Sequence, residues 1–506
     1  MEHATENLAT GVKPKRSKFA ILFMAVMALA FSYVITKEVV IPSWIIAASA
    51  LAGGIVLFTM GIHRPEVVTY VLVAYLPFSK VLVGGFGGLA MALNLTNLLM
   101  LFIFMVWMTG KFAHDEPLWL SSPLNVPVAL FILMGFLSVM RGTYYGTGYG
   151  WFAFVEFKRW ITPILMFFLV LNTVKDRVTI RNVVIIVIVV TTIVGLMAIY
   201  DYINVGESSL EKARIGGIAE HSNSLAAFFN YYMFLPLGFF LLSKKKIKSW
   251  LLLIPFLIQF RGIMVTFSRG GYMAFALGLY AITFFRSKML FFLLLFATVF
   301  AMINPFFLPA GIRYRMGQTF TKPVSYTQAV SEEKFPEEAL ETSARTRVDV
   351  WKGAIAMIKE QPLLGVGYGL FYPMISYYWS QHRPIDAHNT YLIIAAEMGI
   401  PTLLIFLFIV FQVIRNTYLL YRTTQDPFSK AVALGFLGGL FALLMSNMFG
   451  SRLDSQEVSS YFWILSALIM RLMILDQKEK TVPTVFRAKS QMLDAAWNLE
   501  GDQIYD

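Results

Sequence analysis

The chain contains no cysteine. Disulfide bonds, thiolate metal sites and cysteine nucleophiles are therefore excluded. Charged residues are scarce as well, at 14% of the 506 residues, whereas soluble domains contain roughly 25%. With 57% hydrophobic residues and a mean hydropathy of +0.65, this shortage of charge excludes an ordinary water-soluble fold of this size.

Long apolar runs make up most of the chain. A membrane helix needs about 20 mostly apolar residues, and the sequence therefore predicts an all-α integral membrane protein with about 12–14 transmembrane helices. The expected spans are 19–36, 41–62, 67–83, 93–110, 123–140, 160–174, 182–201, 222–242, 249–267, 271–285, 289–304, 389–414, 431–450 and 458–475.

Lysine and arginine are unevenly divided between the two sets of loops that join these spans. The set that includes Lys244, Lys245 and Lys246 holds more of them, which favours cytoplasmic N- and C-termini. Basic residues before the first span precede no cleavage pattern, so we expect that span to be retained. Because most of the net charge of +12 lies in short loops between spans, no nucleic-acid partner is expected.

This topology divides the chain into five segments. They are a cytoplasmic N-terminus (1–18), a transmembrane bundle (19–304), a large external loop (305–388), C-terminal transmembrane helices (389–475) and a cytoplasmic tail (476–506).

The large external loop is expected to contain an amphipathic helix. Thr342 or Ser343 can cap a helix that ends near Gln361, before Pro362. Apolar residues recur at helical spacing through its second half, so the helix would lie on the membrane surface or pack on the bundle. The acidic run before it is interpreted as solvated, with paired catalytic carboxylates as the alternative.

Cationic and protonatable residues gather on the expected outer face, although they are far apart in sequence. They are Arg214, His221, Arg269, Arg345, Arg347 and His388, with Asn389 beside the last of these and Lys158 and Arg159 at the start of another span. Such a face suits a lipid-linked sugar diphosphate. Arginine binds phosphate oxygens through two parallel hydrogen bonds. Fixed cations also stabilise the diphosphate as it leaves the sugar and gains negative charge. Imidazole titrates near neutral pH, so a neutral histidine can remove a proton from an acceptor hydroxyl.

Each of these residues also has an ordinary structural explanation. External arginines commonly reach toward lipid headgroups, Arg345 and Arg347 can pair with neighbouring glutamates, and His221 can cap a helix. Two further ionisable residues, Arg261 and Glu397, are expected deeper in the bundle, where charges are usually paired or functional. Two functions are compatible with these residues. One is an enzyme that acts on a diphosphate-containing substrate at the outer face, and the alternative is a transporter or flippase for a lipid-linked or anionic substrate. The nearly uncharged inner route and the absence of an internal repeat weigh against it.

The combined pattern resembles the O-antigen ligase and polymerase family over roughly residues 150–415. The resemblance rests on Ser343-Ala344-Arg345 with Trp351, on Pro362-Leu363-Leu364-Gly365-Val366-Gly367-Tyr368-Gly369, on His388-Asn389 followed at fixed spacing by Gly399 and Thr402, on Arg214-Ile215-Gly216-Gly217 with Asn223, and on Ser268-Arg269-Gly270.

The resemblance implies an inverting glycosyltransferase in the bacterial inner membrane that needs no metal and no cofactor. Its donor would be a glycan on undecaprenyl diphosphate, with transfer on the periplasmic side, where residues 305–388 would then lie. His388 would activate the acceptor hydroxyl, and Arg214 and Arg269 would bind the diphosphate with Arg345 contributing. The acceptor stays open among lipid A-core sugars, a lipid-linked repeat unit and protein, with a slight preference for an O-antigen or exopolysaccharide ligase or polymerase.

Overall fold

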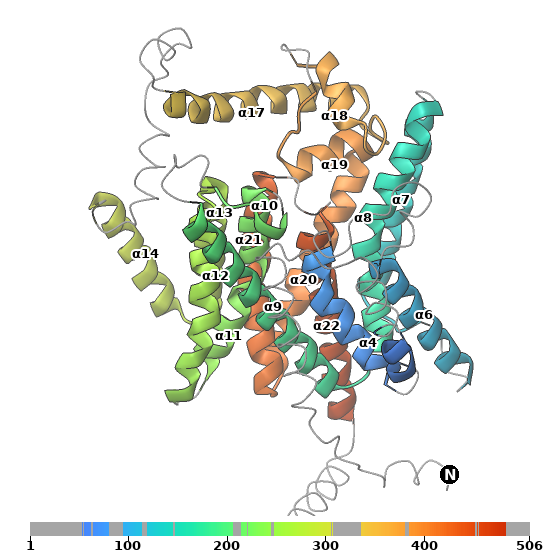
Figure 1. Cartoon of the computed structure of the whole chain (residues 1–506), viewed down its shortest axis with the longest axis vertical. Helices are drawn as coiled ribbons and strands as arrows, with labels where there is room; N and C mark the ends of the chain where they lie inside the picture. Colours follow the sequence, from blue (N-terminus) through green and yellow to red (C-terminus); the bar gives the residue numbers. More distant parts are fainter. Residues whose placement is uncertain are drawn as a thin grey trace, which may run out of the picture.

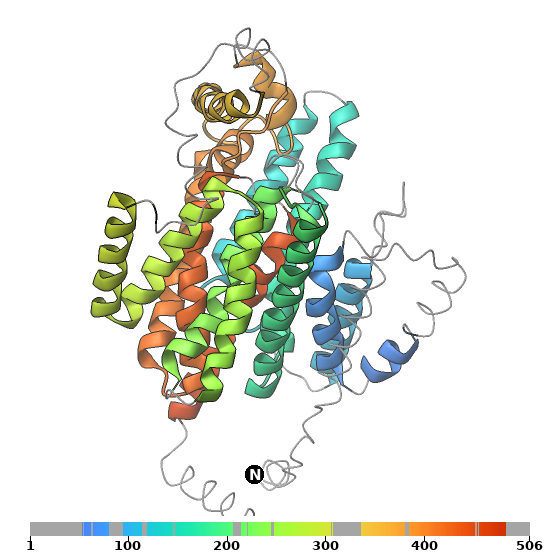
Figure 2. The same ribbon diagram turned by 60° about the vertical axis from the view of Figure 1, so that its left-hand side comes forward.

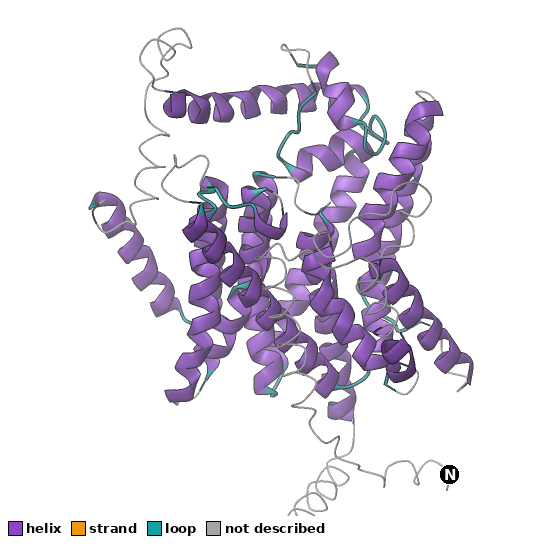
Figure 3. Cartoon of the chain, viewed as in Figure 1, coloured by secondary structure: helices purple, strands orange, loops and turns teal. Residues whose placement is uncertain are grey.

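The structure is a computed structural model of the 506-residue chain. It describes residues 53, 55–61, 64–79, 95–113, 119–144, 147–205, 214–219, 221–243, 247–304, 306, 335–379, 384–450, 453 and 455–481. All of the secondary structure in these residues is helical (Figure 3), which confirms the predicted all-α class.

Seven helices among the described residues are long and apolar enough to cross a membrane, by length and composition. They are α6 (Leu95–Ala113), α7 (Asn125–Thr143), α9 (Arg177–Asn204), the consecutive pair α10 (Ser222–Tyr232) and α11 (Phe234–Leu242), α20 (Ile400–Thr423), α21 (Pro427–Met448) and α22 (Gln456–Thr481). The remaining helices of the bundle are α4 (Pro65–Tyr75), η1 (Leu76–Phe78), α8 (Thr147–Thr173), η3 (Gly217–Ala219), η4 (Ile247–Leu252), α12 (Leu253–Val265), α13 (Arg269–Arg286), α14 (Lys288–Ile303) and α19 (Thr390–Met398). The predicted span 19–36 and the first part of 41–62 lie outside the described residues.

The two ends of the bundle are built differently. At one end, Arg177 at the start of α9 forms ion pairs with Asp426, Asp476 and Glu479, which ties α9 to α21 and α22. At the other end, α17 (Phe335–Glu360) lies across the helices (Figures 1 and 2). We call these the Arg177 end and the α17 end.

The segment that contains α17 has a hydrophobic core of its own. Together with α18 (Phe371–Met374) and η6 (Ile375–Tyr377), α17 encloses a cluster of buried residues that is separate from the bundle core. The cluster consists of Val350, Ala354, Met357, Val366, Leu370, Phe371, Ile375, Trp379, Ala387 and Ala396. Since Ala396 belongs to α19, this cluster also attaches the segment to the bundle.

Two sequence expectations for this region need correction. The helix ends at Glu360, as predicted, but it begins at Phe335 rather than after a cap at Thr342 or Ser343. Pro336 in the first turn suits a helix start, because its fixed φ is already helical and its missing N–H has no partner there. The expected single span 389–414 is also divided, because Gly399 has φ +86° and separates α19 from α20.

The glycine-rich segment 362–369 crosses the C-terminal end of α19 and explains this break. Its amides at Val366 and Gly367 donate to the carbonyl oxygens of Ala396 and Glu397, at 2.9 and 3.0 Å. A Cβ atom on Gly399 would lie 2.0 Å from the Leu363 oxygen, so only glycine fits this crossing. The segment therefore holds α19 in place from its C-terminal side.

Helix α21 packs backbone to backbone against α10 and α11. Cβ atoms on Gly435 and Gly439 would lie 2.6 and 2.1 Å from the carbonyl oxygens of Phe234 and Tyr231. Small residues permit such close approach between membrane helices, where packing replaces the hydrophobic effect as the main attraction. The close approach fixes the C-terminal end of α21 at the α17 end of the bundle.

Candidate functional site

The predicted catalytic residue His388 lies directly before α19, at the α17 end. Asn389 is the N-cap of this helix, and its side-chain oxygen accepts hydrogen bonds from the amides of Tyr391 and Leu392 at 3.0 and 3.2 Å. Asn389 is thus occupied in capping the helix, as the sequence preference for asparagine at this position predicts. The cap fixes the backbone at the start of α19, next to His388.

Buried hydrogen bonds attach the start of α19 to the end of α21. The hydroxyl of Thr390 lies 2.7 Å from Oδ1 of Asn447 and 2.8 Å from the carbonyl oxygen of Gly450. Nδ2 of Asn447 donates in turn to the hydroxyl of Tyr231 on α10, at 2.9 Å. Buried polar groups that are satisfied in this way favour one arrangement of the helices. The network therefore fixes His388 relative to α10 and α21.

Asp386, which the sequence interpretation did not single out, lies beside His388. Its Oδ2 atom lies 2.9 Å from Nδ1 of His388, within ion-pair distance but off the geometry of a good hydrogen bond. Nδ1 is buried, whereas the His388 side chain as a whole is 38% exposed, so the exposed part of the ring lies away from Asp386. The pattern Asp-Ala-His was the available signal, since carboxylates commonly orient histidines.

The second predicted element is the start of α13. Ser268 is the N-cap, and its hydroxyl accepts a hydrogen bond from the amide of Gly271 at 3.1 Å. Arg269 is the first residue of the helix and is half-buried. A helix N-terminus carries partial positive charge, which adds to the charge of Arg269. This turn is therefore suited to an anion.

Arg214 approaches the same turn from the segment before α10. Its guanidinium donates to the carbonyl oxygen of Thr266 at 3.4 Å and to Oδ1 of Asn223 at 3.2 Å. Thr266 lies in the turn between α12 and α13, so these contacts hold Arg214 next to the turn that precedes Arg269.

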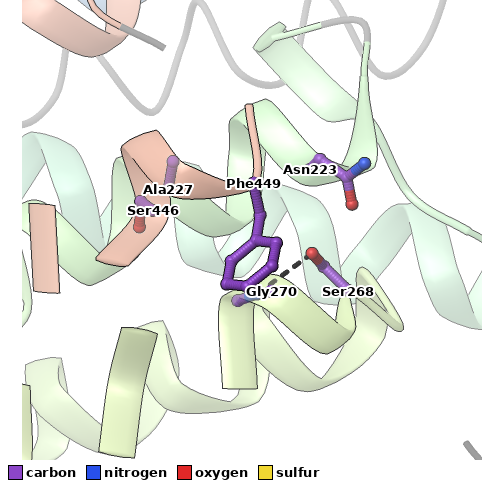
Figure 4. A pocket seen from close by; sticks show the side chains of 7 residues that line it. Asn223, Ala227, Ser268, Gly270, Ser446 and Phe449 are labelled. Atoms are coloured by element: carbon purple, nitrogen blue, oxygen red, sulfur yellow. Dashed lines mark hydrogen bonds between the residues drawn. The ribbon is translucent and has the colours of Figure 1, made fainter. Parts of the chain in front are cut away.

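A small, shallow recess that is partly open to solvent lies beside this turn. It is lined by Asn223, Ala227, Ser268, Gly270, Gly271, Ser446 and Phe449. Figure 4 shows the ring of Phe449 between Asn223 and Ser268 on one side and Ala227 and Ser446 on the other, with the hydrogen bond accepted by Ser268 as a dashed line. A Cβ atom on Gly270 would lie 2.9 Å from Cβ of Phe449, so glycine lets the end of α21 approach α13 closely.

The end of α21 connects the two halves of the site. Phe449 packs against Gly270 at the start of α13, and the next residue, Gly450, is in contact with Thr390 at the start of α19. The histidine and the first arginine of α13 thus stand on either side of one short segment. The segments that carry Arg269 and His388 are therefore linked through the residues that follow α21.

Other predicted residues have different surroundings. Lys158 and Arg159 lie well inside α8 rather than at the start of a span, because the helix extends back to Thr147. Arg159 forms an ion pair with Glu156, one turn earlier, at 2.8 Å, which favours continuation of the helix through this charged stretch. Lys158 and Arg159 therefore lie in the middle of α8, and not at its end.

The two deeper residues have separate partners. The guanidinium of Arg261 is exposed and lies over the ring of Tyr202, 5.4 Å from its centroid. Glu397 is buried, and its carboxylate accepts a hydrogen bond from the amide of Phe371 at 3.0 Å. Glu397 thereby links α19 to the segment that carries α18, which indicates a structural contribution.

The remaining predicted residues differ in how much the structure says of them. His221 occupies the N-cap position of α10 and is exposed, but its side chain forms no capping hydrogen bond. Arg347 is half-buried on α17, above the bundle. The side chain of Arg345, on the same helix, lies outside the described residues. Within the described part of the chain, no group of three His, Asp or Glu residues is placed to hold a metal ion.

The seven apolar helices of membrane-spanning length among the described residues indicate a multi-pass membrane protein, and α17 lies across one end of the bundle. Residues 254–407 match the Wzy_C family model, described as O-antigen ligase, so this part of the chain is an O-antigen ligase domain. The match to this domain supports a membrane enzyme of the O-antigen ligase and polymerase type, a family that implies lipid-linked glycan substrates. A comparison with curated proteins gives no significant match.

The matched segment runs from the start of α12 into α20. It includes Arg269, Arg347, Asp386 and His388. Arg214 lies outside it, as do the residues of α8. The contacts of Arg214 with Thr266 and Asn223 are therefore an independent reason to include it in the site.

Proposed function

We propose that the protein transfers a glycan from undecaprenyl diphosphate to an acceptor hydroxyl, as an O-antigen ligase or as an O-antigen or exopolysaccharide polymerase. The acceptor is a lipid A-core sugar or a second lipid-linked glycan. The active site is the cluster at the α17 end. The observation that carries the proposal is the position of His388: its side chain is partly exposed, and it lies two residues before Thr390, which contacts Gly450 in the short segment after α21. The neighbouring residue of that segment, Phe449, packs against Gly270 in the arginine-bearing first turn of α13.

His388 acts as the general base in one displacement step. The acceptor O–H proton moves to Nε2 of His388, and the acceptor oxygen forms a bond to the anomeric carbon. The bond from that carbon to the diphosphate oxygen breaks, and its electron pair leaves with undecaprenyl diphosphate. A single attack from the opposite face inverts the configuration at the anomeric carbon.

Arg214 and Arg269 bind the diphosphate and stabilise the charge that it gains. The guanidinium of Arg214 contacts the turn before α13 at Thr266, and Arg269 is the first residue of that helix, where the helix N-terminus adds positive charge. Fixed donors aimed at developing charge are among the largest contributions to catalysis. Arg347 on α17 is a further candidate for the diphosphate, as is Arg345 by the resemblance alone, and Lys158 and Arg159 on α8 are less direct candidates. The chemistry requires neither a metal nor a cofactor, because the arginines supply the positive charge.

The proposed setting is the bacterial inner membrane, with both termini in the cytoplasm and the α17 end in the periplasm. In this orientation the site lies at headgroup depth, where the phosphates of a lipid-linked donor are found. The lysine-rich loop near residue 245 then faces the cytoplasm, in agreement with the positive-inside rule. Membrane lipids surround the bundle.

The test is a transfer assay with purified protein, undecaprenyl-diphosphate-linked glycan and a panel of acceptors, in buffer with EDTA. The variants are His388→Ala and His388→Asn; asparagine tolerates the left-handed backbone found at this position. Wild type is expected to transfer the glycan in EDTA, and both variants are expected to bind donor without transferring it. Equal transfer by all three proteins would contradict the assignment of His388, and the successful acceptor would separate ligase from polymerase.

A further inference from the structure

Asp386, Ala387 and His388 form the turn that precedes the N-cap of α19, and each has a distinct structural feature. Asp386 lies beside the His388 ring, Ala387 is fully buried in the core of the α17 segment, and His388 itself has a left-handed backbone with φ +49°. Nothing in the transfer step described above requires Asp386. Its position needs a separate explanation.

The turn is braced by α17. Nε1 of Trp351 donates a hydrogen bond to the carbonyl oxygen of Ala387 at 2.8 Å. The Ala387 methyl group belongs to the same buried cluster as Val350 and Ala354 of α17. The residue between Asp386 and His388 is thus fixed both by its backbone and by its side chain. This fixes the direction in which the flanking side chains leave the turn.

The left-handed backbone of His388 is uncommon for a residue other than glycine. Such conformations cost on the order of 1–3 kcal/mol and persist where surrounding contacts over-determine them. Here the surrounding contacts are the Trp351 hydrogen bond on one side and the Asn389 cap on the other. Their combined effect is to turn the imidazole so that Nδ1 is buried toward Asp386.

We propose that Asp386 is a positioning residue for His388 and that Trp351 holds the turn in which the two meet. This inference rests on the proposed function. Asp386 keeps the proton on Nδ1 of the neutral imidazole, so that the lone pair of Nε2 is available to the acceptor hydroxyl. After proton transfer, the carboxylate lies beside the imidazolium and stabilises it without taking its proton, the arrangement known for carboxylate–histidine pairs in other enzymes.

The first variant is Asp386→Asn, which preserves the size of the side chain and removes its charge. Because its amide can present an N–H to Nδ1, it also favours the wrong tautomer. The expected result is a fall in kcat of about 10- to 100-fold, a part of the roughly 10²- to 10⁴-fold that a positioned base contributes, with the donor Kd unchanged. Asp386→Glu, which restores a carboxylate, is expected to recover part of the lost kcat.

The matched control is Asp349→Asn. Asp349 lies on α17, is paired with Lys352 at 3.1 Å and is 52% exposed, so this variant removes one carboxylate from the same segment without reaching His388. The expected kcat and donor Kd are those of wild type. The control separates a local effect on His388 from a general loss of negative charge.

The second variant is Trp351→Phe, which keeps an aromatic ring in the core and removes the N–H that binds Ala387. It is expected to lower kcat in the same direction with the donor Kd unchanged. Tyr378→Phe, which removes a hydroxyl bound to Glu360 at 2.7 Å in the same segment, is expected to leave kcat as in wild type.

The outcomes separate this inference from the proposed function. Transfer by wild type and its loss in His388→Asn test the function alone. If Asp386→Asn retains wild-type kcat, or if it weakens donor binding as much as it lowers kcat, Asp386 is not a positioning residue, and the role of His388 stands. If Asp386→Glu is no better than Asp386→Asn, the carboxylate charge is not what matters, and the inference fails.

Discussion

Phe267 and His388 share one backbone conformation. Each has φ +49°, and among the residues that the structure describes they are the only ones other than glycine with positive φ. Each also stands directly before the N-cap of a helix, Ser268 of α13 and Asn389 of α19. These two left-handed residues therefore lie at the helix starts that carry Arg269 and His388, and backbone strain commonly accompanies function.

The first prediction concerns donor binding by Arg269. Arg269→Gln removes the positive charge at the start of α13, and it is expected to weaken the binding of undecaprenyl-diphosphate-linked glycan about 10-fold or more, since hydrogen bonds to charged groups contribute roughly 1.5–3 kcal/mol. Binding of labelled donor to purified protein measures the effect. The control is Arg286→Gln at the other end of the same helix, where the guanidinium binds the carbonyl oxygen of Leu241. Equal donor affinity in the two variants would contradict the assignment.

The second prediction concerns the crossing of segment 362–369 over α19. Gly399→Ala places a Cβ atom 2.0 Å from the Leu363 oxygen at a backbone φ of +86°, so the segment must move. A loss of roughly 2–4 kcal/mol in stability is expected from combined overlap and strain, visible as a lower melting temperature and lower abundance. Gly110→Ala is the control, because nothing lies within 4 Å of its Cβ position. A melting temperature like that of wild type in Gly399→Ala would show that the crossing is not rigid.

The third prediction concerns the buried network behind His388. Thr390→Val removes the hydroxyl that lies between Asn447 and the Gly450 carbonyl. Buried groups left without a partner cost about 1–3 kcal/mol, so the melting temperature and kcat should both fall. Thr417→Val, whose hydroxyl binds only within its own helix, at Val413, is the control. The network has no influence on the site if both variants transfer glycan equally well.

The fourth prediction concerns the effect of pH on the Arg177 end. Burial opposes ionisation of Asp426, but hydrogen bonds from Ser429 and the charge of Arg177 outweigh it and hold the pKa of this carboxyl below its usual value. The unfolded chain, with a carboxyl pKa of about 3.9, then binds the proton more readily. The stabilisation is present above about pH 4 and is lost as the pH falls through the lower pKa of the folded state.

Melting curves of wild type and Asp426→Ala between about pH 3 and pH 7 measure this contribution. The gap in melting temperature between the two proteins is expected to be constant near neutrality and to narrow in acid. Asp349→Asn, which changes an exposed carboxylate, should show no such gap. A gap between wild type and Asp426→Ala that does not change with pH would mean that the charge of Asp426 contributes nothing.

The helical class and the positions of most spans could be predicted because apolar length alone determines them. Arg269 and His388 could be singled out because each stands next to the start of an apolar run, whereas Arg214 lies in a polar segment and its contact with Thr266 depends on the fold. The break at Gly399 could not be foreseen, because it results from a close crossing by a segment 30 or more residues earlier in the chain. The start of α17 at Phe335 differs from the expected cap at Thr342 or Ser343, because a proline in the first turn, Pro336, is also a helix-start signal.

Contacts between distant segments set the remaining limits. Asp386 was missed because a carboxylate two residues before a histidine meets it only if the turn is bent, and here the bend depends on Trp351. The role of Asn447 was equally hidden, since its partners Thr390 and Tyr231 lie on two other helices. The spacing of residues in the sequence does not predict these contacts, because they form only when the helices pack together.

The central claim is that the protein breaks the bond between glycan and diphosphate. The most direct measurement follows donor labelled in its undecaprenyl diphosphate portion, in liposomes that contain purified wild type or His388→Asn, with acceptor present. The account predicts that wild type releases free undecaprenyl diphosphate in step with new glycan on the acceptor, and that His388→Asn leaves the donor intact. Movement of intact donor between leaflets, with no release by either protein, would contradict the account and favour a carrier.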